Sequence, residues 1–192
     1  MPRRTLARVL AAGALLVTAA CSKQPAGYGY DPARAFKDDA QTNTHVSPDQ
    51  LALSFVDADG RPVALADYRG QKAVVLVVMR GFTGSVCLYC SAQSARLVTN
   101  YPEFAKRGAE VLVVYPGPKE HIATYLKRVR EEAGTEAVPF RVLLDPDFAA
   151  VDRLGIRGEL AKPSTYILDK DGRVRFARSE VERIRAGRVP IW

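Results

Sequence analysis

A continuous apolar run, rich in β-branched residues, extends from Ala73 to Met79. A run of this kind fits a central strand that is buried on both faces of a sheet. A second buried strand is predicted over Glu110 to Tyr115, which is apolar from Val111 onwards and stops at Pro116-Gly117-Pro118. Strands buried on both faces need a covering layer on each side, so the two runs predict a sheet enclosed by helices.

Helical spacing of apolar residues follows each of these runs. A helix that begins near Cys87 is predicted by four residues, Leu88, Ala92, Ala95 and Val98. Pro102 is expected to interrupt this helix, with one further turn reaching Gly108. After the second run, Lys119 to Ala133 has the pattern of an amphipathic helix, which Gly134 ends.

The remaining elements predict an α/β fold. The alternation from Leu51 to Val56, the turn at Asp59-Gly60 and the return at Val63 predict an N-terminal β-hairpin. Four short elements follow the second helix, namely Phe140–Leu144, a helix over Asp147–Leu154, and a hairpin of Ser164–Leu168 with Val174–Phe176. The whole pattern predicts a central mixed β-sheet flanked by helices, with the N-terminal hairpin as an extension. Ser179–Ala186 leaves room for one short helix near the end.

The first 20 residues have the features of an export signal. Arg3, Arg4 and Arg8 precede an apolar run from Val9 to Ala20, which is too short for a stable membrane-spanning helix. The run ends Leu16-Val17-Thr18-Ala19-Ala20-Cys21, which resembles the lipobox of bacterial lipoproteins. That resemblance implies cleavage before Cys21 and a lipid on its sulfur. Thr18 stands where lipoproteins prefer Leu, and the alternative is an ordinary secretory signal that leaves Cys21 free.

These features predict a signal peptide over residues 1–20, a flexible tether over 21–49 and a folded domain over 50–192. Removing the signal lowers the net charge from +7 to +4, because three Arg and no acidic residues are lost. The remaining basic residues alternate with acidic ones, as in residues 127–132, so no nucleic-acid partner is expected. The chain is expected in the cell envelope, anchored by lipid to a membrane and facing the periplasm or the exterior.

A Cys-x-x-Cys pair, Cys87-Leu88-Tyr89-Cys90, lies where the first buried run gives way to its helix. This context is typical of redox pairs rather than of zinc sites. The spacing puts the two cysteines one helical turn apart, close enough to form a disulfide. Free N–H groups and the positive dipole at a helix start favour the thiolate. Cys87 is therefore predicted to attack a partner disulfide, and Cys90 to resolve the mixed disulfide.

Two other uses of the pair are weighed against redox chemistry. A structural zinc site needs four Cys or His ligands, and only His45 and His121 are available besides the pair, so neither a metal nor another cofactor is expected. A purely structural disulfide remains open for an exported protein. It would close so small a loop that it would restrict the unfolded chain very little.

From about Leu51 to Ala177 the chain resembles the thioredoxin-like superfamily, and within it the redoxin or AhpC/TSA (peroxiredoxin-like) branch. The resemblance rests on three segments, Val75–Phe82, Cys87–Cys90 and Pro163–Gly172. It implies a thioredoxin fold with an N-terminal hairpin extension.

Peroxiredoxins carry the pattern Pro-x-x-x-Thr/Ser-x-x-Cys, which neither cysteine satisfies here. If Cys87 is the peroxidatic residue, Arg80 and Gly84 occupy the Pro and Thr positions, and if it is Cys90, Thr83 and Cys87 do. The downstream Arg of peroxiredoxins is replaced by Pro163, which looks like the cis-proline of thioredoxin-like oxidoreductases. An ordinary trans proline at the start of a strand is the alternative.

The resemblance implies a substrate groove formed by Pro163, Lys162 and Tyr89. Arg80, Lys162 and Arg157 are candidates for stabilising a thiolate by charge, although the sequence does not locate them. The copper-carrying Sco type is a poor match, because its cysteines are one residue further apart and no His follows His121.

The residues are consistent with three functions. The favoured one is a thiol–disulfide oxidoreductase of the cell envelope, with Cys87 and Cys90 as its catalytic residues. The alternative is a peroxiredoxin-like thiol peroxidase, and the third is a non-catalytic lipoprotein that binds through a thioredoxin fold. The expected partners are protein or small-molecule disulfides or hydroperoxides, a thiol redox partner, and the membrane that takes the lipid.

Overall fold

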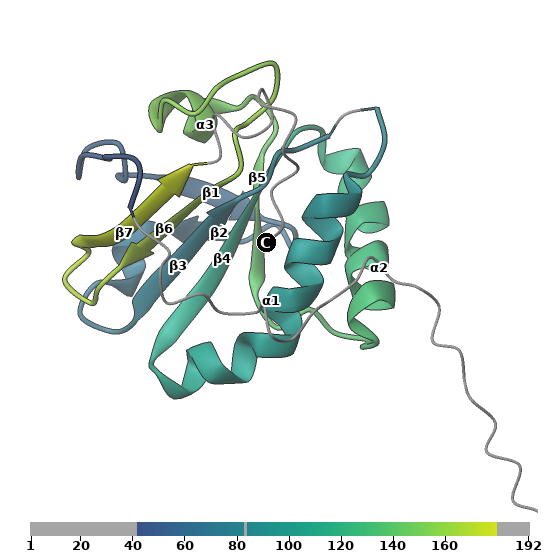
Figure 1. Ribbon diagram of the computed structural model, residues 1–192, viewed down its shortest axis with the longest axis horizontal. Coiled ribbons are helices and arrows are strands. Elements are labelled where there is room, and N and C mark those ends of the chain that lie inside the picture. Colours follow the sequence, from purple (N-terminus) through teal and green to yellow (C-terminus); the bar gives the residue numbers. More distant parts are fainter. Residues whose placement is uncertain (1–41, 83, 180–192) are drawn as a thin grey trace, which may run out of the picture. The chain divides into compact units, whose positions relative to one another are not determined.

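The computed structural model describes residues 42–82 and 84–179, which form a sheet with helices on its faces (Figure 1). The strands are β1 (Ser54–Asp57), β2 (Pro62–Ala64), β3 (Ala73–Val78), β4 (Ala109–Pro116), β5 (Arg141–Asp145), β6 (Ser164–Leu168) and β7 (Val174–Ser179). The helices are α1 (Leu88–Lys106), α2 (Ile122–Ala133) and α3 (Ala149–Arg153), with 3₁₀ turns η2 (Leu65–Tyr68) and η3 (Lys119–His121).

All seven strands belong to one sheet, in the order β2-β1-β5-β4-β3-β6-β7. The central strands β3, β4 and β5 are parallel to one another. The outer strands β1, β2, β6 and β7 each pair antiparallel to their neighbours. The predicted fold class is confirmed, because the sheet is mixed, helices flank it, and the hairpin of β1 and β2 extends it beyond β5.

Residues of β3 and β4 alternate between two apolar clusters, one on each face of the sheet. Val75, Val77 and Met79 face the same cluster as Val111, Val113 and Tyr115, together with Ile122, Tyr125 and Val129 of α2 and Cys90 of α1. Val74, Leu76 and Val78 face the other cluster, together with Ala150 and Val151 of α3. Both runs are thus buried on both faces, as their composition predicts.

Pro102 does not interrupt α1, which continues to Lys106, so the predicted break is wrong. A proline inside a helix removes one backbone hydrogen bond but leaves the flanking turns free to pack. Val98, Tyr101 and Phe104 pack against the apolar cluster under α1 on both sides of the proline. This packing holds the two parts of the helix in one element.

The second predicted helix is divided. Lys119–His121 forms the 3₁₀ turn η3, and α2 begins at Ile122. Its end agrees with the prediction, because Gly134 is the residue after α2 and adopts a left-handed conformation with φ 64°.

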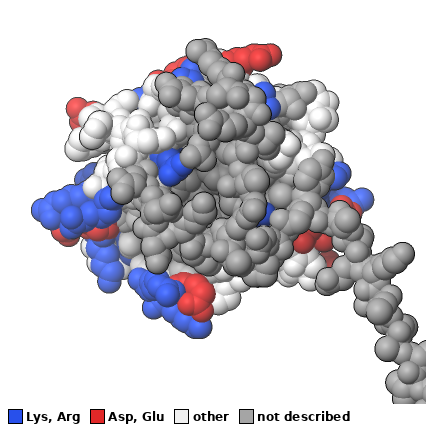
Figure 2. Space-filling view, viewed as in Figure 1, with Lys and Arg blue, Asp and Glu red and all other residues white. Residues whose placement is uncertain are grey.

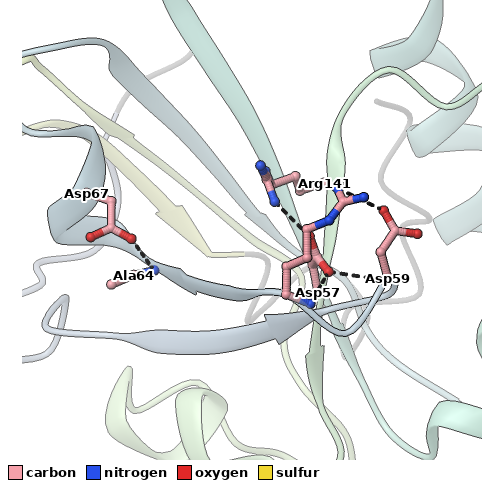
Figure 3. A network of polar contacts seen from close by, with 6 residues as sticks. Asp57, Asp59, Ala64, Asp67 and Arg141 are labelled. Carbon is pink, nitrogen blue, oxygen red and sulfur yellow. Dashed lines mark hydrogen bonds and ion pairs between the residues drawn. The ribbon is translucent and has the colours of Figure 1, made fainter.

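A buried carboxylate closes the β1–β2 turn and ties it to β5. Asp57 is 3% exposed. Its Oδ1 accepts the N–H groups of Asp59 and Arg61, while its Oδ2 lies 2.8 Å from the guanidinium of Arg141 (Figure 3). Burial alone would raise the pKa of Asp57, but the hydrogen bonds from Arg61 and Arg141 outweigh burial and lower it.

The free edge of β7 is partly covered by the segment that precedes the sheet. The Asn43 N–H donates to the Ala177 carbonyl, its side-chain amide donates to the Ser179 carbonyl, and its Oδ1 accepts the Ser179 N–H. Asn43 therefore satisfies edge groups that would otherwise be open to another strand. The predicted domain boundary at residue 50 stays a prediction, although the ordered contacts of the domain already begin at residues 42–43.

Acidic and basic side chains lie close together on the surface, as Figure 2 shows on one face. Exposed ion pairs include Arg61–Asp59, Lys106–Glu103 and Arg173–Asp171. The expected lack of a nucleic-acid partner stays a prediction.

Among the residues that the structure describes, no helix combines the length and apolar character that a membrane crossing needs. The predicted signal peptide, Cys21, most of the tether and the short helix over Ser179–Ala186 lie outside the described residues, apart from Ser179 itself at the end of β7.

Candidate active site

The loop that carries the cysteines is held against the end of β4 by close backbone contact. Gly81 has φ +96°, and a Cβ there would lie 2.4 Å from the Pro116 carbonyl oxygen. The Phe82 N–H donates to the same carbonyl at 3.3 Å. The Phe82 ring stacks on His121, with ring centroids 3.7 Å apart and an interplanar angle of 4°. Glycine at position 81 is thus what lets the loop approach β4.

The cysteine pair lies at the start of α1, directly after this loop. Cys87 is the residue that precedes the first turn, and Cys90 lies within that turn. Cys87 is partly exposed, Cys90 is 5% exposed, and both are free thiols. The Cys90 thiol donates a hydrogen bond to the Cys87 sulfur. The two sulfur atoms are therefore adjacent, as the spacing predicts.

Cys87 is set up as a thiolate at neutral pH. The hydrogen bond from Cys90 is the largest influence, and the backbone N–H groups of Cys90 and Tyr89 and the charge of Arg80 add to it. Partial burial opposes them, and the net result lowers the pKa of Cys87 from 9.0 to about 6. The thiolate is the nucleophilic form of cysteine, so this residue is activated for attack.

Cys90 has the opposite character. Its hydrogen bond to Cys87, its burial and the charge of the Cys87 thiolate raise its pKa well above 9.0. The backbone N–H groups of Arg80 and Gly81 point at its sulfur and act against this rise. The structure therefore separates the pair into an activated outer sulfur and a protonated inner sulfur, a division that favours different roles in one reaction.

A buried tyrosine that sequence reasoning passed over belongs to the apolar cluster that contains the pair. Tyr115 is 2% exposed, and among the described residues its hydroxyl is a buried polar atom without a hydrogen-bond partner. Burial, followed by the charges of Cys90 and Cys87, raises the pKa of Tyr115 to about 12. In the sequence, the one sign of this residue was a tyrosine at the end of a predicted buried strand.

Two contacts bind the start of α1 to α2. The Ser91 hydroxyl donates to Glu132 Oε1 at 2.8 Å. One turn of α1 after Cys90, the hydroxyls of Ser94 and Tyr125 lie 2.5 Å apart. Ser91 and Ser94 are fully buried. These contacts fix the turn that carries Cys90, because buried hydroxyls are held by the partners they bond to.

Pro163 lies at the same end of the sheet as the pair, but its predicted cis geometry is wrong. Among the described residues no peptide bond is cis. Pro163 directly precedes β6, whose first residue, Ser164, pairs with Val78 of β3. The peptide bond before Pro163 is therefore trans, the form that X–Pro bonds favour. The position suits proline because a residue at the start of a strand need not donate to the ladder. The neighbouring Ala161 N–H donates to the Arg80 carbonyl, so this segment lies beside the second residue after β3.

The other predicted groove residues are placed differently. Tyr89 is 53% exposed, and its backbone N–H acts on Cys87. The Lys162 side chain lies beside Gly158, where a Cβ would be 3.9 Å from its Cε. The proposed groove of Pro163, Lys162 and Tyr89 stays a prediction.

Three cationic residues, Arg80, Lys162 and Arg157, were candidates for stabilising a thiolate. Arg80 is the one whose charge acts on the Cys87 thiolate. Arg157 instead pairs with Asp152 at 2.7 Å and lies over the Phe148 ring. Within residues 42–82 and 84–179, no group of three or more His, Cys, Asp or Glu side chains lies together as metal ligands would.

Known proteins similar to this chain are peroxiredoxins. This chain is 29% identical over 150 residues to a putative peroxiredoxin of Mycobacterium tuberculosis H37Rv. The match covers 72% of this chain and 88% of that protein. It is 25% identical over 131 residues to the peroxiredoxin Bcp of Escherichia coli K12, covering 64% and 77% respectively.

Solved structures share the fold at lower identity. Peroxiredoxin Q of Xanthomonas campestris matches with a TM-score of 0.56 at 16% identity, over 74% of this chain and 89% of that chain. Peroxidoxin BcpB of Mycobacterium tuberculosis matches with a TM-score of 0.55 at 20% identity, over 73% and 86%.

The model of the AhpC/TSA family matches residues 42–177, which include strands β1 to β6, most of β7, the cysteine loop and both long helices. This match favours an oxidoreductase over the non-catalytic binding protein considered above. From the geometry of the pair and this match together, the chain belongs to the AhpC/TSA family of oxidoreductases.

Proposed function

We propose that this chain is a thiol peroxidase in which Cys87 is the peroxidatic cysteine and Cys90 resolves the oxidised product. The Cys87 thiolate attacks a hydroperoxide oxygen, so that an S–O bond forms while the O–O bond breaks. Sulfur loses two electrons, and the departing alkoxide or hydroxide takes up a proton. The product is a Cys87 sulfenic acid and an alcohol or water.

The second step closes the disulfide. The Cys90 sulfur attacks the Cys87 sulfenic acid, an S–S bond forms, and hydroxide leaves and combines with the Cys90 proton as water. An external dithiol then reduces the disulfide by thiol–disulfide exchange and is itself oxidised. One hydroperoxide and one dithiol are consumed in each cycle.

The observation that carries this proposal is the unequal pair, with Cys87 at a pKa of about 6 and Cys90 protonated and donating to it. Kinship with peroxiredoxins adds to it, as the two relatives named above are called peroxiredoxins. The peroxiredoxin Thr is missing in both registers, and Arg80 and Gly84 occupy the pattern positions before Cys87. Arg80 supplies positive charge at the thiolate instead.

Peroxide consumption by the reduced chain tests the proposal. The expected rate exceeds that of free cysteine, and Cys87→Ser abolishes the excess. Cys90→Ser still consumes one equivalent and accumulates a sulfenic acid that dimedone traps. A rate equal to that of free cysteine, or an excess that survives Cys87→Ser, would contradict the proposal.

Disulfide exchange is the second candidate function, because the hydrogen-bonded Cys-x-x-Cys pair also suits it. It uses the same nucleophile and the same resolving residue, with a peptide disulfide in place of the hydroperoxide. The same preparations distinguish the two functions. Cys87-dependent exchange on a model peptide, combined with peroxide consumption no faster than free cysteine, assigns the chain to disulfide exchange.

We further propose that the chain is exported and anchored by lipid on Cys21, which would put the peroxidase in the cell envelope. The support is the basic start, the short apolar run and the small residues before Cys21. Labelling with a fatty-acid analogue in a bacterial host tests it. Label is expected on the full chain and not on Cys21→Ser, whereas equal labelling of both would overturn the anchor.

A further inference from the structure

Tyr115 carries a buried hydroxyl that the fold leaves without a partner. Buried polar groups almost always have one, and an exception in a native site calls for a reason. The reason is not space for the ring, because phenylalanine would fill the same volume. An acceptor that forms near this hydroxyl during the reaction would supply the partner.

The strands place Tyr115 in the same apolar cluster as Cys90. Val78 pairs with Val114, and the Met79 N–H donates to the Val114 carbonyl at 3.0 Å, so Met79 and Tyr115 lie side by side. Both face the apolar cluster that contains Cys90. Arg80 and Gly81, which follow Met79, aim their N–H groups at the Cys90 sulfur.

The aromatic contact of Tyr115 with Tyr125 further defines where Tyr115 lies. The Tyr115 ring packs on Tyr125, with ring centroids 5.0 Å apart. Tyr125 contacts Ser94, which lies one helical turn after Cys90 on α1. Tyr115 therefore lies beneath the first turns of α1, where the charges of both cysteines reach its phenol.

We propose that the Tyr115 hydroxyl is a hydrogen-bond donor to the Cys90 thiolate, which it stabilises whenever that sulfur carries negative charge. With the Arg80 and Gly81 N–H groups it completes a set of donors around a buried anion. This inference rests on the proposed function, in which Cys90 becomes negative twice. It becomes negative as it attacks the Cys87 sulfenic acid, and again as the leaving group when an external thiolate attacks Cys87 in the disulfide.

In the resting state the Cys90 thiol donates a hydrogen bond to Cys87, and the Tyr115 hydroxyl has no hydrogen-bond partner among the described residues. When the Cys90 proton leaves, the sulfur becomes an acceptor and the phenol donates to it. A buried anion without donors is strongly disfavoured, so each donor lowers the barrier to forming it.

The pKa of Cys90 is the direct readout, measured in the full chain carrying Cys21→Ser and Cys87→Ser by thiolate absorbance. Tyr115→Phe is expected to raise the pKa of Cys90 by about one unit, a tenfold change in the thiolate equilibrium. Tyr166→Phe is the matched control, because Tyr166 is equally buried but belongs to the cluster on the opposite face of the sheet. It is expected to leave the pKa of Cys90 unchanged.

Two further measurements separate this role from a structural one. In the otherwise native chain, Tyr115→Phe is expected to slow disulfide closure after peroxide addition about tenfold without lowering resistance to urea, since it removes a hydroxyl that has no partner. Incorporating 3-fluorotyrosine at position 115, a more acidic donor, is expected to lower the pKa of Cys90. This second substitution keeps the ring and hydroxyl, and so tests the idea even if Tyr115→Phe folds poorly.

The outcomes distinguish the two proposals. An unchanged pKa of Cys90 in both Tyr115 variants overturns the role of Tyr115 and leaves the peroxidase untouched. A shifted pKa in a chain that fails to consume peroxide supports the donor while contradicting the peroxidase. A large loss of stability in Tyr115→Phe with no change in the pKa of Cys90 assigns the phenol to packing, and this too overturns the inference.

Discussion

At the scale of single residues, the reactivity of this site comes from one helix turn and one loop. Cys87 is activated chiefly by a neighbouring thiol, with help from backbone N–H groups and Arg80. Cys90 is held back by the same hydrogen bond and by burial. The two sulfurs therefore differ through their surroundings, since their side chains are identical.

The alkylation rate of Cys87 should follow its thiolate fraction. Because its pKa is lowered to about 6, the rate with iodoacetamide should rise through pH 6 and level off near pH 7.5. Cys90 should remain unmodified over this range, because its pKa is raised and it is buried. Mass spectrometry of the quenched protein gives both rates. A half-maximal rate near pH 9 for Cys87 would refute the activation described here.

Gly81 is a position where a single methyl group should be harmful. Gly81→Ala should lower the free energy of unfolding by about 2–4 kcal/mol, because it combines positive φ with a clash against the Pro116 carbonyl. Gly84→Ala is the matched control, since Gly84 also has positive φ (+81°) but nothing within 4 Å of a Cβ. It should cost only about 1 kcal/mol of backbone strain. Urea unfolding compares the two, and equal losses would show that the clash is relieved.

At the scale of elements, the N-terminal hairpin is attached to the sheet by buried apolar side chains such as Phe55 and Val63, by pairing of β1 with β5, and by the carboxylate of Asp57. The carboxylate joins the β1–β2 turn to Arg141 at the start of β5. Sequence patterning located this hairpin correctly, but its attachment to β5 depends on a contact between residues 84 positions apart. Local periodicity carries no signal for such a contact.

Asp57→Ala should lower the free energy of unfolding by about 2–4 kcal/mol near neutral pH, because it leaves buried donors without their acceptor. Asp59→Ala removes only an exposed ion pair and should cost less than about 1 kcal/mol. The pKa of Asp57 is lowered in the fold, so its contribution is present above about pH 4 and is lost as the pH falls through its folded value. The difference between native chain and Asp57→Ala should therefore shrink towards pH 2, and a constant difference would contradict this account.

At the scale of the whole molecule, the fold couples stability to redox state. The Cys87–Cys90 disulfide closes too small a loop to restrict the unfolded chain much. The reduced form instead gains stability from the Cys87 thiolate, whose pKa falls from 9.0 to about 6 on folding. This gain is fully present above the unfolded pKa and is lost as the pH falls through about 6.

The reduced chain should therefore be more stable than the oxidised chain at pH 7.5, and the difference should narrow at pH 5.5. Thermal unfolding of both forms at the two pH values measures this, with Cys87→Ser as the control whose stability lacks the thiolate contribution. A stabilised reduced form also makes the disulfide a ready oxidant, as a cycle that returns it to thiols requires. An oxidised form that is more stable at both pH values would contradict the coupling.

The layered sheet, the hairpin and the position of the cysteine pair could be predicted from the sequence, because these depend on periodicity, turn residues and spacing along the chain. Two predictions failed. The helix continues through Pro102 because residues on both sides of it pack against one cluster, and Pro163 leads into β6 with a trans peptide bond. The roles of Cys87 and Cys90 were predicted from their order at the helix start, but the tertiary structure was needed to show the hydrogen bond that makes them unequal. It was also needed to show that the charge of Arg80 acts on Cys87 while Arg157 pairs with Asp152, and that Tyr115 shares an apolar cluster with Cys90. Such features depend on distances between residues remote in sequence, and these distances exist only once the sheet and helices have packed.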